Sequence, residues 1–429
     1  MASYASIFLN DKEVFSYRNE VHSEVNYFFS PSDRVEIVGQ EAIKYAHGYF
    51  ALEDYDEDEL EALEVIAYQA SAEVVRDRLT VLGYGMKIVE DVFVEMRQIL
   101  LESSQRTVEY LAEMESDSDH QVYVQQSKQS LRYYQELTFP QWLEDVKTHL
   151  SEKAGMEVPD QRDLGVLDLF ESMDQRVVMR LLSEVAAPGD IFTLDLTELS
   201  EGGWLDGDIS VITGPDIDGK PNAGPPIVIT EGRFDARVLQ ESIKLLKPHL
   251  AGYVRFLDYD VGNEGGAAAA VRMVKSFAAA GIANPVLALF DNDSAAREAV
   301  LGFGTINLPR HFRIMHYPDL GFASSYPTLG PQGSVDMDVN GLAGSIELYL
   351  GRDVLSREDG SLLPVQWKGY MGKIKAYQGE ILDKSAVQKA FERKLDTANK
   401  TPGALAAQDW SGILSIIDAL MDALSRSFD

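Results

Sequence analysis

Apolar and polar residues follow one pattern in the first part of this chain and another after Pro226. Short extended runs at 6–9 and 13–17 flank the turn-forming residues Asn10-Asp11-Lys12, a pattern typical of a β-hairpin. From Asp58 to about Leu150 the apolar residues recur at helical spacing instead. One such face combines Leu60, Leu63, Ile66 and Ala67, and later helical stripes carry Ile88, Val92, Met96, Leu131, Tyr134 and Trp142. We therefore expect a mainly helical N-terminal domain with a short β-hairpin start.

After Pro226 continuous apolar runs alternate with helical segments. The runs predict strands at 227–230, 253–258, 286–290 and 312–316, and helices are expected at 234–247, at 265–281 and from 294. Strands that are apolar throughout and alternate with helices are typical of a parallel sheet covered on both faces. The fold class we expect is therefore α/β, with a four-stranded, mainly parallel sheet flanked by helices.

The domain boundaries follow from composition. Residues 185–226 are rich in Gly, Pro and Asp, which indicates a connector rather than a packed element. We expect an N-terminal domain at 1–200, a connector at 201–225, an α/β core at 226–320 and a helical extension at 321–429.

Composition excludes several classes of protein. The 429 residues are 45% hydrophobic and 25% charged, and none is cysteine. Disulfides, thiolate zinc sites and cysteine nucleophiles are thereby excluded. No run of about 18 apolar residues and no signal-peptide pattern occurs, so we expect a cytoplasmic protein that does not span a membrane.

The net charge of −31 is unevenly distributed. Residues 1–225 carry 45 acidic and 17 basic side chains (45 − 17 = 28 negative), whereas residues 226–429 carry 24 and 21 (24 − 21 = 3 negative). Within 361–400, 8 basic side chains outnumber 4 acidic ones. A polyanion such as nucleic acid, which needs Lys and Arg, is therefore compatible with the second half of the chain.

Carboxylates follow two of the predicted strands. Glu231 ends the first apolar run of the α/β core, with Asp235 four residues later, and Asp291 and Asp293 follow the third run. The carboxyl ends of parallel strands share one edge of a sheet, where ligands bind. Carboxylate oxygens are the ligands that Mg²⁺ prefers. Each motif alone also fits an acidic helix N-terminus or cap, but the pair favours a magnesium site and phosphodiester chemistry.

Residues 226–320 resemble a Toprim domain, the catalytic module of topoisomerases, DnaG-type primases and several nucleases. The resemblance rests on Glu231, Asp291 and Asp293, and it is strongest to overcoming-lysogenization-defect nucleases, which share Glu-Gly-x-x-Asp and Phe-Asp-Asn-Asp motifs. Residues 1–200 resemble the N-terminal region of HEPN/Toprim-associated proteins.

The resemblance implies further site residues. Glu347 matches the later acidic ligand of those nucleases, and its alternative is an exposed helix carboxylate. Lys384 matches their late lysine, with Lys368 and Lys373 as rivals, and for each of the three the alternative is a solvated surface lysine. Such a lysine would stabilise negative charge on the reacting phosphate. Asp258 and Asp260 follow the second strand, and each would either hold a metal ligand in place or be exposed to solvent.

HEPN ribonucleases use an Arg and a His four to six residues apart, and the chain offers little that matches. Only Arg310 and His316 have this spacing, and they lie on a predicted strand, so we interpret the match as chance. Arg18 and His22 are too close together. The acidic run 53–64 is interpreted as a solvated helix start. A HEPN-like N-terminal domain would then serve assembly, and a homo-oligomer is expected through it.

The function predicted is a nuclease that hydrolyses phosphodiester bonds with one or two Mg²⁺ or Mn²⁺ ions. Its metal ligands would be Glu231, Asp235, Asp291, Asp293 and Glu347, with Lys384 assisting. The resemblance implies prokaryotic anti-phage defence, and a separate sensor or ATPase is expected because no P-loop motif occurs. DNA, RNA and tRNA all stay open as substrates. The alternative is a non-catalytic scaffold or antitoxin-like binding module.

Overall fold

The protein is described by a computed structural model, which defines residues 3–10, 12–38, 42, 64–113, 118–151, 169–170, 173–205, 212, 224–258, 265–304, 306–331 and 333–425. The chain divides into two compact units, Met1–Ile217 and Asp218–Asp429. Most of the expected connector at 201–225, nearly all of the acidic run 53–64 and Asp260 lie outside the described residues.

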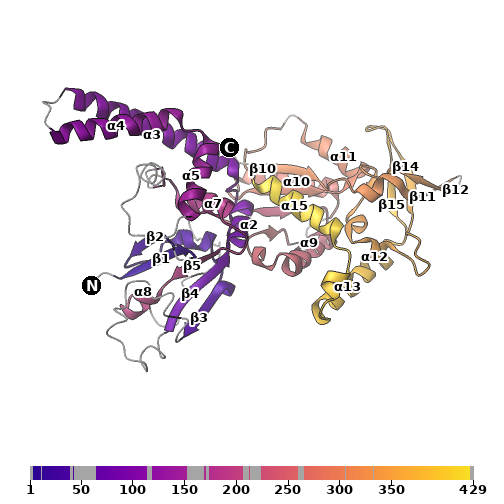
Figure 1. Ribbon diagram of the computed structural model, residues 1–429. Coiled ribbons are helices and arrows are strands. Elements are labelled where there is room, and N and C mark those ends of the chain that lie inside the picture. The colour runs from indigo at the N-terminus through magenta and orange to yellow at the C-terminus, as the bar shows by residue number, and fades with distance from the viewer. Residues whose placement is uncertain are drawn as a thin grey trace. The chain divides into compact units, whose positions relative to one another are not determined.

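The N-terminal unit contains a five-stranded antiparallel sheet with the order β2-β1-β5-β4-β3 (Figure 1). Its strands are β1 (Tyr4–Leu9), β2 (Lys12–Arg18), β3 (Arg34–Val38), β4 (Glu64–Ser71) and β5 (Ile191–Asp195). The paired strands β1 and β2 confirm the expected hairpin start.

The expectation of a mainly helical N-terminal domain is wrong in its first segment. Ile66 and Ala67, assigned to a helix face, lie on strand β4. Ala67 pairs with Asp195, a residue more than a hundred positions away on β5. A short apolar run is compatible with either a helix or a strand, and here the pairing with the distant strand β5 makes it a strand.

The other described elements of the N-terminal unit are helical, as expected. Its helices are α2 (Ala72–Val81), α3 (Met86–Ala112), α4 (Ser118–Glu136), α5 (Phe139–Ser151), α7 (Gln175–Val185) and α8 (Thr197–Glu201), with 3-10 turns at Ser23–Tyr27 and Pro31–Asp33. Figure 1 shows α3 and α4 as a long hairpin that extends away from the sheet. The core combines aliphatic and aromatic side chains, and within it Phe93 stacks on Trp142 with ring centroids 5.0 Å apart. Arg78, fully buried in α2, is neutralised by Asp33.

The C-terminal unit contains a parallel sheet with the order β10-β8-β6-β7. Its strands are β6 (Ile227–Ile229), β7 (Arg255–Phe256), β8 (Val286–Phe290) and β10 (Phe312–His316), and its helices are α9 (Arg233–Leu246), α10 (Ala267–Ala280) and α11 (Ser294–Val300). All four predicted strands and all three predicted helices are confirmed, although β7 is shorter than expected. Every side chain of β8 is buried, as its unbroken apolar sequence requires.

The chain from residue 321 onward is not the helical extension that we expected. It contains a second sheet, β12-β11-β14-β15, made of β11 (Tyr326–Gly330), β12 (Gly333–Met337), β14 (Val365–Met371) and β15 (Ala376–Ile381). A bulge between Trp367 and Gly369 interrupts β14, and such irregular short strands leave little periodic signal in the sequence. This segment also contains four helices among its described residues. Helix α12 (Arg352–Leu355) precedes β14, and α13 (Lys384–Lys400), α14 (Ala404–Ala407) and α15 (Ser411–Ser425) follow β15.

A two-residue ladder joins the later segment to the parallel sheet. Strand β9 (Asn292–Asp293) pairs with β13 (Ala343–Gly344), so that Asp293 lies opposite Ala343. No helix in the described part of the chain combines the length and apolar character that a membrane crossing requires.

Candidate active site

Two strand ends of the parallel sheet are linked through a carboxylate. Glu231 follows β6 and Asp291 follows β8, the neighbouring strand. The backbone amide of Asp291 donates a hydrogen bond to Oε1 of Glu231 at 2.9 Å. This bond fixes Glu231 against the end of β8, because the parallel strands end at the same edge of the sheet.

Asp291 carries a fully buried carboxyl. Burial, together with the negative charges of Asp235 and Glu231, raises its pKa well above the ordinary value. Its Oδ1 is buried and, among the described residues, has no hydrogen-bond partner. A buried carboxylate oxygen without a donor is costly, so this position favours a proton or a cation.

Glu231 and Asp235 share the same environment. Burial raises the pKa of Glu231 to about 7, and the charges of Asp293 and Asp235 add to the effect. Burial also raises the pKa of Asp235 to about 6, although the Tyr317 hydroxyl opposes the rise by donating to Oδ1 of Asp235 at 3.0 Å. Three neighbouring carboxyls therefore hold protons more strongly than exposed ones would.

Asp293 has a structural role in the observed geometry. Its Oδ1 accepts from the amide of Ala296 at 2.7 Å and thereby caps α11. Its Oδ2 accepts from Nε2 of Gln378 on β15 at 2.7 Å. The helix-cap interpretation of the Asp-Asn-Asp motif is thus realised, and the side chain still interacts electrostatically with Glu231 and Asp291.

Glu347 and Lys384 reach the site from the later segment of the chain. Glu347 lies on the 3-10 turn Ile346–Tyr349, is 3% exposed and accepts from Ser345 (2.7 Å) and Gln388 (2.9 Å). Lys384 Nζ lies 3.4 Å from Oε2 of Glu347. Burial alone would lower the pKa of Lys384, but the charges of Glu347 and Asp291 outweigh it and the pKa is raised.

Lys384 owes its place to a local turn. Asp383 adopts a left-handed conformation (φ 57°) and its carboxylate accepts from the amide of Ala386, which begins α13 at Lys384. The first residue of the helix is thereby directed toward Glu347. Of the three candidate lysines, only Lys384 interacts with the predicted carboxylates, because Lys368 pairs with Glu380 and Lys373 with Glu298.

The fold therefore brings all six predicted residues into one electrostatic group, which we call the acidic site (Glu231, Asp235, Asp291, Asp293, Glu347 and Lys384). Their catalytic roles stay predictions. Asp258, by contrast, is exposed.

The donor set of the acidic site fits a hard cation in its chemistry. Carboxylate oxygens are what Mg²⁺ and Mn²⁺ prefer, and the unpartnered Oδ1 of Asp291 is available to an ion. Among the described residues, however, no three acidic or histidine side chains already stand in a metal-binding arrangement. The carboxylates therefore have to turn toward a shared point in order to hold an ion.

Sequence reasoning missed the side chains that hold the carboxylates. Tyr317 orients Asp235, Gln378 orients Asp293 and Gln388 orients Glu347. His316, which we interpreted as a chance match, contacts the carbonyl oxygen of Asp291 through Nδ1 at 2.8 Å. Both His316 and Tyr317 lie at the carboxyl end of β10, so the strand-end rule that found Glu231 could have found them. The glutamines give no such signal.

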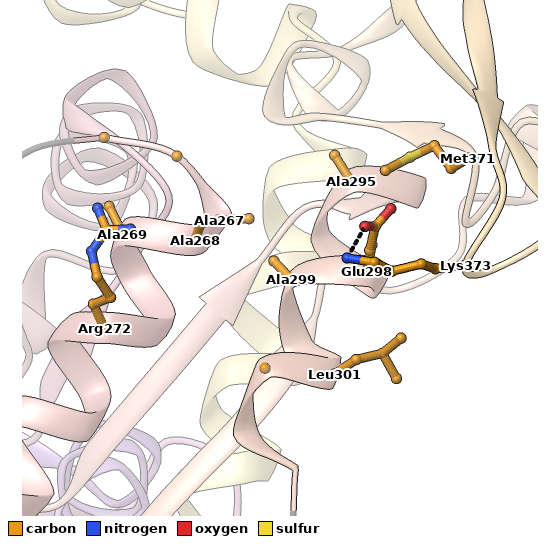
Figure 2. A pocket seen from close by; sticks show the side chains of 13 residues that line it. Ala267, Ala268, Ala269, Arg272, Ala295, Glu298, Ala299, Leu301, Met371 and Lys373 are labelled. Carbon is orange, nitrogen blue, oxygen red and sulfur yellow. Dashed lines mark ion pairs between the residues drawn. The ribbon is translucent and has the colours of Figure 1, made fainter.

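A groove of about 700 Å³ borders the acidic site. Figure 2 shows alanines of α10 on one side and Ala295, Glu298 and Ala299 of α11 on the other, with Lys373 paired to Glu298 at 2.9 Å. The amide of Gly266, at the start of α10, donates to the carbonyl of Glu231. The small residues leave the groove open, so an extended ligand could pass close to the backbone here.

Comparison with known proteins identifies the family. No curated protein and no solved structure matches the chain. A model of the family described as HEPN/Toprim N-terminal domain 1 matches residues 1–216, which is half of the chain. This match confirms the resemblance stated for the N-terminal residues. The chain therefore belongs to the HEPN/Toprim N-terminal domain 1 family.

Proposed function

We propose that this protein is a metal-dependent nuclease whose active site is the acidic site of a Toprim-type C-terminal unit. The single observation that carries the proposal is the pairing of Glu231 with Asp291 in a buried position where Asp291 Oδ1 has no partner. Buried like charges destabilise a fold unless protons or cations offset them. The parallel sheet and the membership in a HEPN/Toprim family support the same proposal.

The residues of the acidic site and their hydrogen-bond partners would have three roles: holding metal ions, orienting the carboxylates and stabilising charge on the phosphate. Glu231, Asp235, Asp291, Asp293 and Glu347 would hold one or two Mg²⁺ or Mn²⁺ ions, which when bound supply an activated water and stabilise the leaving oxygen. Tyr317 and Gln378 keep two of these carboxylates oriented through hydrogen bonds of 3.0 and 2.7 Å. Lys384, held at the edge of the acidic site by Glu347, would face the negative charge that develops on the phosphate.

The biological context is a further proposal. The motifs around Glu231 and Asp291 resemble those of overcoming-lysogenization-defect nucleases, and this resemblance supports a role in anti-phage defence. A separate sensor or ATPase would supply the trigger. Assembly of a homo-oligomer through the N-terminal unit is also proposed, on the basis of its HEPN/Toprim family membership.

The test is cleavage by the purified full-length chain. Plasmid DNA, single-stranded DNA and tRNA are incubated with the protein in Mg²⁺, in Mn²⁺ or in EDTA. We expect metal-dependent cleavage of at least one substrate, lost in Glu231→Gln and in Asp291→Asn. Glu241→Gln, an exposed change on α9, is the matched control and should cleave normally. Cleavage that persists in EDTA and in Glu231→Gln would overturn the proposal.

A non-catalytic scaffold is the second candidate, favoured by the hydrogen bonds that already occupy both oxygens of Asp293. Titration calorimetry with Mn²⁺ separates the two candidates. A scaffold would bind no ion at the acidic site and would show the same heats as Asp291→Asn, whereas the nuclease would bind Mn²⁺ and lose binding in that variant.

A further inference from the structure

An apolar groove lies on the second sheet of the C-terminal unit. It has a volume of about 610 Å³, and its walls include Val335, Met337, Leu342, Trp367 and Tyr377. Several of these side chains are exposed: Val335 is 57% and Met337 44% accessible. Soluble proteins seldom expose such contiguous apolar surface without a ligand or partner for it.

Two aromatic rings, Trp367 and Tyr377, line this groove, and a third, Tyr370, adjoins Tyr377. Tyr370 and Tyr377 lie opposite each other on β14 and β15, with ring centroids 5.2 Å apart, and Trp367 lies 6.4 Å from Tyr377. The two tyrosines are 58% and 56% exposed. Exposed rings on neighbouring strands form the type of surface on which successive unpaired bases stack.

The charge of this hairpin suits a polyanion. Residues 365–381 carry three lysines and one glutamate. Lys368 pairs with Glu380 and Lys373 with Glu298, so Lys375 is the cation of this hairpin that remains for a ligand. Lys375 lines the groove itself. An apolar protein segment would gain nothing from that lysine, whereas the phosphates that accompany stacked bases would.

The groove is connected to the acidic site through adjacent residues on two segments. Tyr377 precedes Gln378, whose side chain holds Asp293 at 2.7 Å. Leu342, in the groove wall, precedes Ala343, which pairs with Asp293 in the β9–β13 ladder. Because successive side chains of a strand alternate between faces, the side chain of Tyr377 lies at the groove and that of Gln378 lies on the opposite face of β15, where it holds Asp293.

We propose that this groove binds single-stranded DNA by stacking unpaired bases on Trp367 and Tyr377 of its wall and on the adjoining Tyr370. As an assignment of substrate class, the inference rests on the proposed nuclease function. The polar groups of the lining are few, and the hydroxyl of Thr328 is already donated to the carbonyl of Val335 at 2.7 Å. A ribose 2′-hydroxyl would lose water there without gaining a partner, which favours DNA over RNA.

The experiment measures binding separately from cleavage. A fluorescein-labelled 20-nucleotide DNA strand, its blunt duplex and the RNA of the same sequence are titrated with the full-length protein in EDTA, and anisotropy is recorded. The test variant is Tyr370→Leu/Tyr377→Leu. The control is Tyr110→Leu/Tyr123→Leu, which changes two comparably exposed tyrosines of α3 and α4. Circular dichroism melts confirm that each variant is folded.

We expect the test variant to bind the DNA strand at least about tenfold more weakly, since each stacked base contributes about 1–3 kcal/mol, or about 5- to 150-fold. Duplex binding and the control variant should not change. The inference is overturned if the test variant binds the strand normally, if duplex binding weakens equally, or if the RNA binds tenfold more tightly than the DNA.

A second variant covers the case in which the double leucine variant does not fold. Lys375 has a positive φ of 54°, a conformation that asparagine tolerates, so Lys375→Asn removes the charge with little strain. Its plot of log affinity against log salt should flatten by about 0.7 for the single strand. An unchanged slope would contradict the inference.

The inference and the proposed function can fail independently. Normal strand binding by Tyr370→Leu/Tyr377→Leu, together with metal-dependent cleavage by the wild type, overturns the inference alone. Tyrosine-dependent strand binding, with neither cleavage nor binding of Mn²⁺ at the acidic site in calorimetry, supports the inference and overturns the nuclease.

Discussion

The amide of Asp291 donates a hydrogen bond to Oε1 of Glu231 across 2.9 Å, and so joins the ends of two parallel strands through one carboxylate. The bond holds Glu231 beside a second buried carboxyl whose Oδ1 has no partner among the described residues. The fold thus keeps like charges close together at a position where only a proton or a cation can offset them.

Glu231→Gln should stabilise the metal-free protein at neutral pH. Burial raises the pKa of Glu231 from 4.5 to about 7, so the folded state binds its proton more tightly than the unfolded state. The stability that this group contributes is fully present below about pH 4.5 and is lost as the pH rises to about 7. In EDTA, the melting temperature of the wild type should fall from pH 5 to pH 8 more steeply than that of Glu231→Gln.

The exposed change Glu241→Gln should leave that pH dependence unaltered. Parallel melting curves for the wild type and Glu231→Gln between pH 5 and pH 8 would show that Glu231 titrates as an ordinary exposed carboxyl.

Addition of Mn²⁺ should raise the melting temperature more at pH 8 than at pH 5.5. An ion competes with protons for the carboxylates, and the raised pKa values of Glu231 and Asp235 place that competition between about pH 6 and 7. Differential scanning calorimetry measures the shift. Asp291→Asn should abolish it, and Asp336→Asn, on the exposed strand β12, should not. Equal stabilisation of both variants would place the ion elsewhere.

Tyr317→Phe should lower activity by about 10- to 100-fold, the usual cost of losing a group that orients a metal ligand. The Tyr317 hydroxyl opposes the rise in the pKa of Asp235, so its loss raises that pKa further. The acidic limb of the profile of kcat/KM against pH should therefore move to higher pH. Tyr326→Phe is the control, because that tyrosine is also buried and its hydroxyl donates to the carbonyl of Leu363 instead. If the acidic limb of the profile of kcat/KM against pH stays in place in Tyr317→Phe, Tyr317 does not orient Asp235 for the reaction.

Lys384→Met should reduce kcat by about a hundredfold with little effect on KM, because its charge acts on the transition state. Lys373→Met is the matched change, since Lys373 pairs with Glu298 in the groove of Figure 2 and does not interact with the acidic site. Steady-state kinetics on the substrate found in the cleavage test provides both constants. Equal losses in the two variants would show that Lys384 has no special role.

The parallel sheet was the part of the fold that the sequence predicted best. Strand β8 is apolar at every position and buried at every position, so its local pattern needed no knowledge of its neighbours. Strand β4 was predicted wrongly because its apolar run is compatible with either period until β5 pairs with it. The second sheet was missed since its short strands, one of them bulged, show no sustained alternation.

The amino-acid sequence by itself determined which carboxylates follow buried strands, and hence that Glu231, Asp291 and Asp293 meet at one edge of a parallel sheet. That rule is local, because a strand's direction fixes which end its following residue occupies. Only the tertiary structure decided that Glu347, Lys384, Tyr317 and Gln378 join them. These residues come from turns, strands and helices far along the chain, and their approach depends on long-range packing that leaves no period in the sequence.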